Sequence, residues 1–255
     1  MDWVDQADRL WAGELGVTPR VLRTGGFHVF ERADPTPQLR ATIVGTSSAT
    51  VVSLPLGSAH AFDAAGLRLT QMELAPRHYV ASCVSIPSLD VRGPAYLGYW
   101  PTSFAPPPVR GRAELLDSAG LAALVSLRDL APIEWAEAGI GISPDARVFG
   151  VREEGQIVAV TGYERWPHDI AQLQVFCHPG FRRRGLAAVS LTAAIGDALA
   201  ARLLPQYRAR DGNVASVALA KRVRFVEYGW MATVLIRLPD NAANWTESRD
   251  AHTCG

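Results

Sequence analysis

The sequence predicts an α+β fold in which helices flank a central sheet, and three observations lead to this expectation. Segments rich in β-branched residues recur between clusters of turn-forming residues in both halves of the chain. Between them lie segments whose apolar residues recur every three or four positions, as in amphipathic helices. A proline-rich stretch, PTSFAPPPVRG at 101–111, separates the two halves.

The first half mixes both element types. Trp3, Ala7, Leu10 and Trp11 have the spacing of one helix face. Strands are expected at 28–32, 40–44 and 50–54, and a second helix at 59–67. The histidines of this half lie in different segments without ligand spacing, so we expect no metal site here.

The proline-rich stretch is the expected boundary between two units. Three consecutive prolines at 106–108 fit neither a helix nor a central strand, and such a run is stiff and extended. We therefore expect an N-terminal α/β unit at 1–104, a second domain at 105–240 and a flexible tail at 241–255. The alternative is a long surface loop within one domain.

The second half has a clearer order of elements. Helices are expected at 113–128 and 133–138, and strands at 147–152 and 156–164 with an acidic turn between them. A strand at 170–177 leads through an arginine-rich loop into a helix that ends near 204. A strand at 207–210, a helix at 214–222 and a strand pair or one long strand at 225–238 follow. The polar tail from 239 is expected to fray.

Composition excludes several classes of function. The 25 basic and 25 acidic residues balance, which argues against a nucleic acid or an anionic membrane as partner. Cys83, Cys177 and Cys254 lack metal-ligand spacing and indicate a reducing cytoplasm. No signal peptide and no apolar stretch of membrane-spanning length is expected. Lys221 is the single lysine, an arginine bias typical of a GC-rich bacterial genome.

The segment VFCHPGFRRRGLAA, 175–188, runs from a strand into a helix. A helix start presents unpaired N–H groups and the positive end of the helix dipole, so it attracts anions. Gly185 lets the backbone approach a phosphate, and the three preceding arginines add positive charge. Taken alone, the loop is also compatible with a solvated basic turn.

Two motifs resemble the GCN5-related N-acetyltransferase (GNAT) family. Arg182-x-x-Gly185-x-Ala187 is similar to the family signature Arg/Gln-x-x-Gly-x-Gly/Ala, and the run before it resembles the end of the family's fourth strand. Asn213-x-x-Ser216 and then Phe225 resemble the family's fifth-strand Asn, the helix after it and the aromatic residue of the sixth strand. The resemblance covers about 110–238, and 1–103 carries no such motif. A Rossmann fold is excluded because its glycine-rich turn follows the first strand, whereas the loop here follows several expected strands.

The resemblance implies a mixed, largely antiparallel sheet flanked by helices, of the α/β sandwich type, and acetyl-CoA as cofactor. In the family, the pantetheine arm lies where the fourth and fifth strands separate, and backbone N–H groups there, near Val175 in this chain, stabilise the developing oxyanion. The residues implied to bind the cofactor are Val175, Phe176, Cys177, Arg182, Arg183, Arg184, Gly185, Leu186, Ala187, Ala188, Asn213 and Ser216.

The implied reaction is direct attack of a primary amine on the thioester, which needs a base for the amine proton. Glu164 and Asp169 flank the expected cofactor strand, and Glu164 is favoured. Many family members protonate the thiolate with a tyrosine at the position that is Ala220 here. Tyr228 and Tyr163 are the candidate substitutes, with Tyr228 preferred.

Two residues bear on this interpretation. Cys177 is a possible nucleophile, but a thiol in a buried strand is more often a small hydrophobe. Arg224 stands where the family commonly has a glycine that ends the helix, so we expect a different helix exit.

The sequence therefore predicts an acetyl-CoA-dependent N-acetyltransferase that acts on a small molecule, an amino acid or a peptide. The alternative is an acyl-CoA-binding regulatory module with impaired catalysis, because the usual tyrosine is missing. The element order of 1–104 is compatible with a second, degenerate copy of the same fold that forms a lid over the acceptor cleft. A monomer or a homodimer is expected.

Overall fold

A computed structural model describes residues 2–33, 39–105, 107–108, 111–141 and 147–237. In the first half, the helices are α1 (Trp3–Leu15), α2 (Ala59–Ala64), α3 (Leu69–Met72) and α4 (Pro76–Ser82). The strands are β1 (Gly26–Arg32), β2 (Arg40–Thr46), β3 (Ala49–Pro55) and β4 (Leu89–Tyr99). The sequence predicted each of these elements except α3, α4 and β4.

In the second half, the helices are α5 (Ser118–Leu130), α6 (Pro132–Ala138), α7 (Leu186–Ala200) and α8 (Val214–Val223). The strands are β5 (Glu114–Leu115), β6 (Arg147–Glu153), β7 (Gln156–Trp166), β8 (Ile170–Cys177), β9 (Leu204–Arg210) and β10 (Val226–Ile236). Short 3-10 turns occupy Pro19–Arg23, Cys83–Ser85, Pro167–Asp169 and Pro179–Phe181. The expected frayed tail lies outside the described residues.

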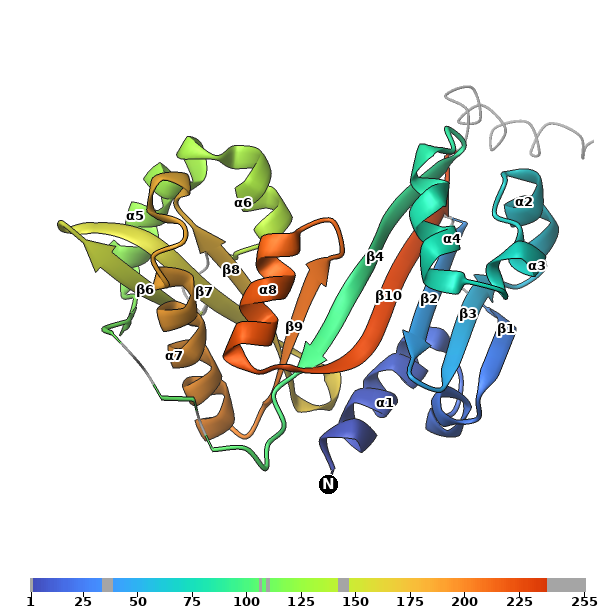
Figure 1. The fold of residues 1–255 in the computed structure, drawn as a ribbon, viewed down its shortest axis with the longest axis horizontal. Coiled ribbons are helices and arrows are strands. Elements are labelled where there is room, and N and C mark those ends of the chain that lie inside the picture. The colour runs from blue at the N-terminus through green and yellow to red at the C-terminus, as the bar shows by residue number, and fades with distance from the viewer. Residues whose placement is uncertain (1, 34–38, 106, 109–110, 142–146, 238–255) are drawn as a thin grey trace, which may run out of the picture.

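The ten strands of the described residues form one sheet in the order β1-β3-β2-β10-β4-β9-β8-β7-β6-β5 (Figure 1). The pairs β1–β3 and β8–β9 are parallel and the other pairs are antiparallel. The predicted mixed, largely antiparallel sheet flanked by helices is therefore confirmed.

Strand β10, the last element that the structure describes, pairs with β2 on one side and with β4 on the other (Figure 1). Strand β4 in turn pairs with β9 through Ala95–Tyr99. Elements from both halves therefore alternate in the middle of the sheet. The expected boundary near residue 104 stays a prediction.

Helices cover both faces of the sheet. Apolar residues of α7 and α8 pack on β6 to β9, and those of α2 to α4 pack on β2, β3 and β10, all on one face. Residues of α1, α5 and α6 pack on the other face. We call these the α7 face and the α1 face. Within the described residues, no helix has the length and apolar character needed to cross a membrane.

Several helix ends differ from the prediction, and two of them have a clear physical reason. Helix α5 begins at Ser118 rather than at 113, because Asp117 caps it by accepting a hydrogen bond from the Gly120 N–H at 2.8 Å. The expectation of a different exit from α8 is wrong: Arg224 itself adopts the left-handed conformation, with φ 78°. The Phe225 N–H donates to the Ala220 carbonyl at 3.0 Å, which stabilises this helix end.

Candidate functional site

The centre of the site is a separation between two parallel strands. Strands β8 and β9 are in register only from the pair Ile170 and Leu204 to the pair Leu173 and Tyr207. Beyond Leu173, β8 continues to Cys177 while β9 continues to Arg210 and pairs on its other side with β4. The β9-facing edge of β8 is thus without a strand partner among the described residues. Its backbone groups can pair with a ligand.

The arginine loop follows β8 directly. The His178 ring nitrogen Nδ1 accepts a hydrogen bond from the Gly180 N–H at 3.0 Å, and the His178 carbonyl accepts one from the Phe181 N–H at 2.9 Å. These bonds turn the chain between β8 and α7. The loop therefore has a defined shape before any ligand binds.

The three arginines have different surroundings. Arg182 forms an ion pair with Glu134, and its Nε donates to the Cys177 carbonyl at 3.3 Å. Arg184 pairs with Glu153 at 3.1 Å and lies over the Phe181 ring. Arg183, at φ 64°, has no ion pair within the described part of the chain. Arg182 and Arg184 stabilise the loop, whereas the Arg183 guanidinium is available to an anion.

Gly185 is the N-cap of the 15-residue helix α7, with φ 84°. A Cβ at Gly185 would meet nothing within 4 Å, so the space above this helix end is open. The Ser190 hydroxyl hydrogen-bonds the Thr161 hydroxyl at 2.9 Å and fixes the first turns of α7 to β7. As at any helix start, the first N–H groups of α7 have no carbonyl partner within the helix, so they can donate to a ligand.

A cleft of about 2140 Å³ joins the loop to the strand separation. The predicted residues that line it are Val175, Phe176, Cys177, Arg182, Arg183, Gly185, Leu186, Ala187, Ala188, Asn213, Ser216 and Glu164. Arg184 and Tyr228 are not among its lining residues. The structure thus brings residues from β7, β8, α7 and α8 into one cavity.

The start of α8 forms the other wall of this cleft. The Asn213 side chain caps the helix, with its Oδ1 accepting from the Ser216 N–H at 3.0 Å. The Ser216 hydroxyl lies 2.8 Å from the Tyr207 hydroxyl. Burial raises the pKa of Tyr207 to about 12, so it stays protonated near neutral pH. Ala220, fully buried, supplies no hydroxyl here.

The two candidate bases differ in position. Glu164, exposed on β7, is opposite Gln172 in the β7–β8 pairing and lines the cleft. Asp169 forms an ion pair with Arg165 and is not among the cleft residues. Of the two carboxylates, Glu164 alone faces the cavity.

The predicted substitutes for the missing tyrosine lie elsewhere. The buried Tyr228 hydroxyl donates to Asp8 at 2.7 Å, and burial raises its pKa. The Tyr163 hydroxyl donates to Asp197 at 2.5 Å, beneath α7. The structure brings neither hydroxyl to the cleft. Burial also raises the pKa of the Cys177 thiol, which opposes a nucleophilic role because the thiolate is the nucleophile.

Sequence reasoning missed several residues of the cleft wall, among them Tyr207 and Arg208. These two lie where β8 and β9 separate. The sequence indicated this place in part, because the strand expected at 207–210 was to border the cofactor. What the sequence does not reveal is the hydrogen bond between Tyr207 and Ser216, since it depends on how α8 folds back over β9.

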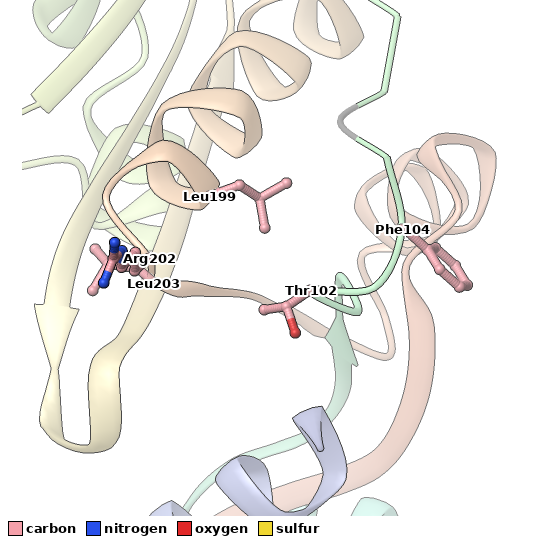
Figure 2. Close-up of a pocket in the computed structure, with 5 residues that line it drawn as sticks. All are labelled: Thr102, Phe104, Leu199, Arg202 and Leu203. Carbon is pink, nitrogen blue, oxygen red and sulfur yellow. The ribbon is translucent and has the colours of Figure 1, made fainter. Parts of the chain in front are cut away.

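A second, smaller hollow of about 300 Å³ lies near the C-terminal end of α7 (Figure 2). Thr102, Phe104, Leu199, Arg202 and Leu203 line it. It shares no residue with the larger cleft, and none of the predicted site residues reaches it.

The family comparison bears on the strands and helices that form this cleft. Residues 139–229 match the family model of the GNAT acetyltransferases. We call this part the GNAT segment. The resemblance of the second half is thereby confirmed, and acyl transfer is the class of chemistry it supports. The first half is not separately matched. No curated protein sequence matches the chain.

Several solved structures are similar to the chain. One is a GNAT-family protein from Novosphingobium aromaticivorans, 20% identical, covering 60% of this chain and 69% of that one, with a TM-score of 0.49. A GNAT acetyltransferase from Colwellia psychrerythraea is 17% identical, with coverages of 73% and 76% and a TM-score of 0.49. The ribosomal-protein-S18-alanine N-acetyltransferase from Escherichia coli is 19% identical, with coverages of 51% and 97% and a TM-score of 0.38. Assignment of the GNAT segment rests on the family model alone.

Proposed function

We propose that this chain transfers the acetyl group of acetyl-CoA to a primary amine of a small molecule, an amino acid or a peptide. One observation carries the proposal: β8 and β9 separate after Leu173 and Tyr207, beside the open N-terminus of α7. A ligand with an extended amide-bearing arm and a pyrophosphate needs such an edge and such a helix end within one cavity.

The residues present fit this cofactor. The first turn of α7 offers N–H groups to the pyrophosphate, and the Arg183 guanidinium, which forms no ion pair with the described residues, adds a positive charge. The partnerless edge of β8, from Val175 to Cys177, offers N–H and carbonyl groups to the pantetheine amides. Asn213 and Ser216 line the opposite wall. When bound, acetyl-CoA supplies an activated acetyl group as a thioester.

The side chains around the separation have complementary roles. Glu164 accepts the proton of the attacking amine, directly or through water. An N–H near Val175 donates a hydrogen bond to the carbonyl oxygen as negative charge develops on it. Tyr207 is protonated because burial raises its pKa to about 12. The Ser216 hydroxyl gives its proton to the departing sulfur, and the Tyr207 hydroxyl gives its proton to Ser216 in turn. Tyr207 thus replaces the hydroxyl that Ala220 lacks.

A second function remains a candidate because Ala220 removes the usual acid. In that case the chain binds an acyl-CoA and regulates a partner without turnover. The cytoplasmic location, the monomeric or homodimeric state and the lid role of the first half likewise stay predictions.

The test combines turnover with cofactor binding. The full chain is incubated with acetyl-CoA and a panel of primary amines while free thiol release is followed, and the Kd of CoA is measured by calorimetry. Gly185→Val should weaken CoA binding at least about tenfold, because its side chain fills the space that the pyrophosphate needs. Gly155→Val is the matched control: its φ is 81°, its Cβ also meets nothing within 4 Å, and it lies in the β6–β7 turn.

The outcomes separate the two functions. Thiol release that depends on an amine supports acetyl transfer. CoA binding without turnover across the panel supports the regulatory module instead. If CoA does not bind, or if both glycine variants weaken binding equally, the proposed cofactor site is wrong.

A further inference from the structure

Arg208 lies at the mouth of the strand separation. It is the first residue of β9 beyond the last pair with β8, and Gln174 is the corresponding residue of β8. Both line the cleft. Because alternate residues of a strand point to the same side, Arg208 shares the face of Gln206, whose register partner is Gln172. Glu164 pairs with Gln172, so this face also carries the proposed base.

The Arg208 guanidinium forms no ion pair within the described ranges, although the charge of Glu14 acts on it from a greater distance. Three other arginines that line the cleft do have one. Arg77 contacts Asp211 at 2.7 Å, Arg92 contacts Asp90 at 3.2 Å and Arg210 contacts Glu137 at 3.5 Å. Arg208 instead lies over the Trp166 ring, 5.3 Å from its centroid. Stacking orients the planar guanidinium and leaves its N–H groups free for a planar anion.

The same face of the neighbouring strand carries an unsatisfied hydrogen-bond acceptor. Gln172, 4% exposed, lines the cleft and donates from Nε2 to the Leu173 carbonyl at 3.1 Å. Its Oε1 is buried and has no hydrogen-bond partner in the described part of the chain. A buried amide oxygen without a partner costs free energy that a donor from a ligand would recover.

We propose that the acceptor is an amino carboxylate, a molecule with both a primary amine and a carboxylate. Arg208 binds the carboxylate through its guanidinium fork, and Gln172 Oε1 accepts a hydrogen bond from the amine near Glu164. A single guanidinium that forms no ion pair with the described residues balances one negative charge, so a monoanionic carboxylate fits better than a dianionic phosphate. This inference rests on the proposed acetyl transfer and narrows its substrate class.

The experiment compares matched acceptors on the full chain. Each set holds an amino carboxylate, the corresponding carboxamide and an amine with phosphate in place of the carboxylate. We expect kcat/KM for the carboxylate to exceed that for the carboxamide about tenfold or more. In Arg208→Gln the KM for the carboxylate should rise about 10- to 100-fold, while the carboxamide changes less than about twofold.

Two further variants keep the test decisive. Arg208→Lys keeps the charge but loses the fork, so it should recover part of the carboxylate preference. Arg92→Gln removes the same charge from the same cleft at a residue already paired with Asp90, and should leave the preference unchanged. If Arg208→Gln does not fold, Arg208→Lys and the selectivity of the unmodified chain carry the test.

The inference is overturned if the unmodified chain uses the carboxamide as well as or better than the carboxylate, or if it prefers the phosphate. It is also overturned if Arg208→Gln lowers kcat/KM equally for all acceptors. These outcomes leave CoA binding and amine-dependent thiol release intact, so the proposed function survives them. Absence of turnover with any amine overturns both proposals. Absence of CoA binding also contradicts the cofactor site.

Discussion

Residues 105–255 are expected not to fold without the first half, because β4 is part of the sheet on which the cleft is built. Removing 1–104 takes away the strand that separates β9 from β10. It also removes Tyr96, Leu97, Tyr99 and Trp100, each at most 3% exposed. Burial of a large apolar side chain contributes about 1.5 to 3 kcal/mol, so these residues account for about 6 to 12 kcal/mol. That is comparable to the whole stability of a typical domain.

The assay is fragment complementation. The piece 105–255 made alone should show no cooperative thermal unfolding and no CoA binding. Made together with 1–104, it should elute as one complex and bind CoA, because β4 and β10 restore the sheet. The control is the full chain cleaved at a protease site inserted in the proline-rich stretch, which should stay assembled. Cooperative unfolding of 105–255 alone, with CoA affinity like that of the full chain, would refute the reasoning.

Three further predictions follow from buried hydroxyls. Tyr207→Phe should lower kcat about 10- to 100-fold with the Kd of CoA unchanged, since it removes the proposed proton donor; an unchanged kcat rules that role out. Tyr228→Phe should lower the free energy of unfolding by about 1 to 2 kcal/mol and leave kcat unchanged, because its hydroxyl bonds buried Asp8 away from the cleft; a loss of kcat with full stability would restore its catalytic role. Burial raises the pKa of Tyr96 and of Tyr163, like that of Tyr207, to about 12. The stability that these protonated hydroxyls provide is therefore present below pH 10 and is lost between pH 10 and 12. An unfolding midpoint in urea that does not fall from about pH 8 to about pH 11 would contradict this.

Most strands and helices of the second half were predictable because their signals are local. The arginine loop, Gly185 and the strand before them lie close together in the sequence, and the structure places them in one cleft as the resemblance implies. That Arg183 forms no ion pair with the described residues was not predictable. It depends on Glu134 and Glu153, which come from a helix and a strand earlier in the chain and pair with the other two arginines.

Strand β4 was missed for a physical reason. Gly93 and Pro94 interrupt its pattern, and such residues argue against a central strand. In the structure they lie at a register shift against β10, between Met231 and Thr233. A Cβ at Gly93, whose φ is 120°, would lie 2.8 Å from the Met231 carbonyl oxygen, so glycine is required at this close approach. Pairing with β9 begins only after Pro94, which has no N–H to donate.

The position of β10 has a consequence for synthesis on the ribosome. The chain makes β2 and β4 early, but β10, which joins them, emerges after every other described strand. Until β10 is made, β2 and β4 each have one edge without a strand partner. Neither half of the sheet can therefore be completed while the rest of the chain is being synthesised. Translation must therefore pass residue 236 before the native topology can close. A premature stop upstream of β10 leaves two open sheet edges, which are templates for aggregation.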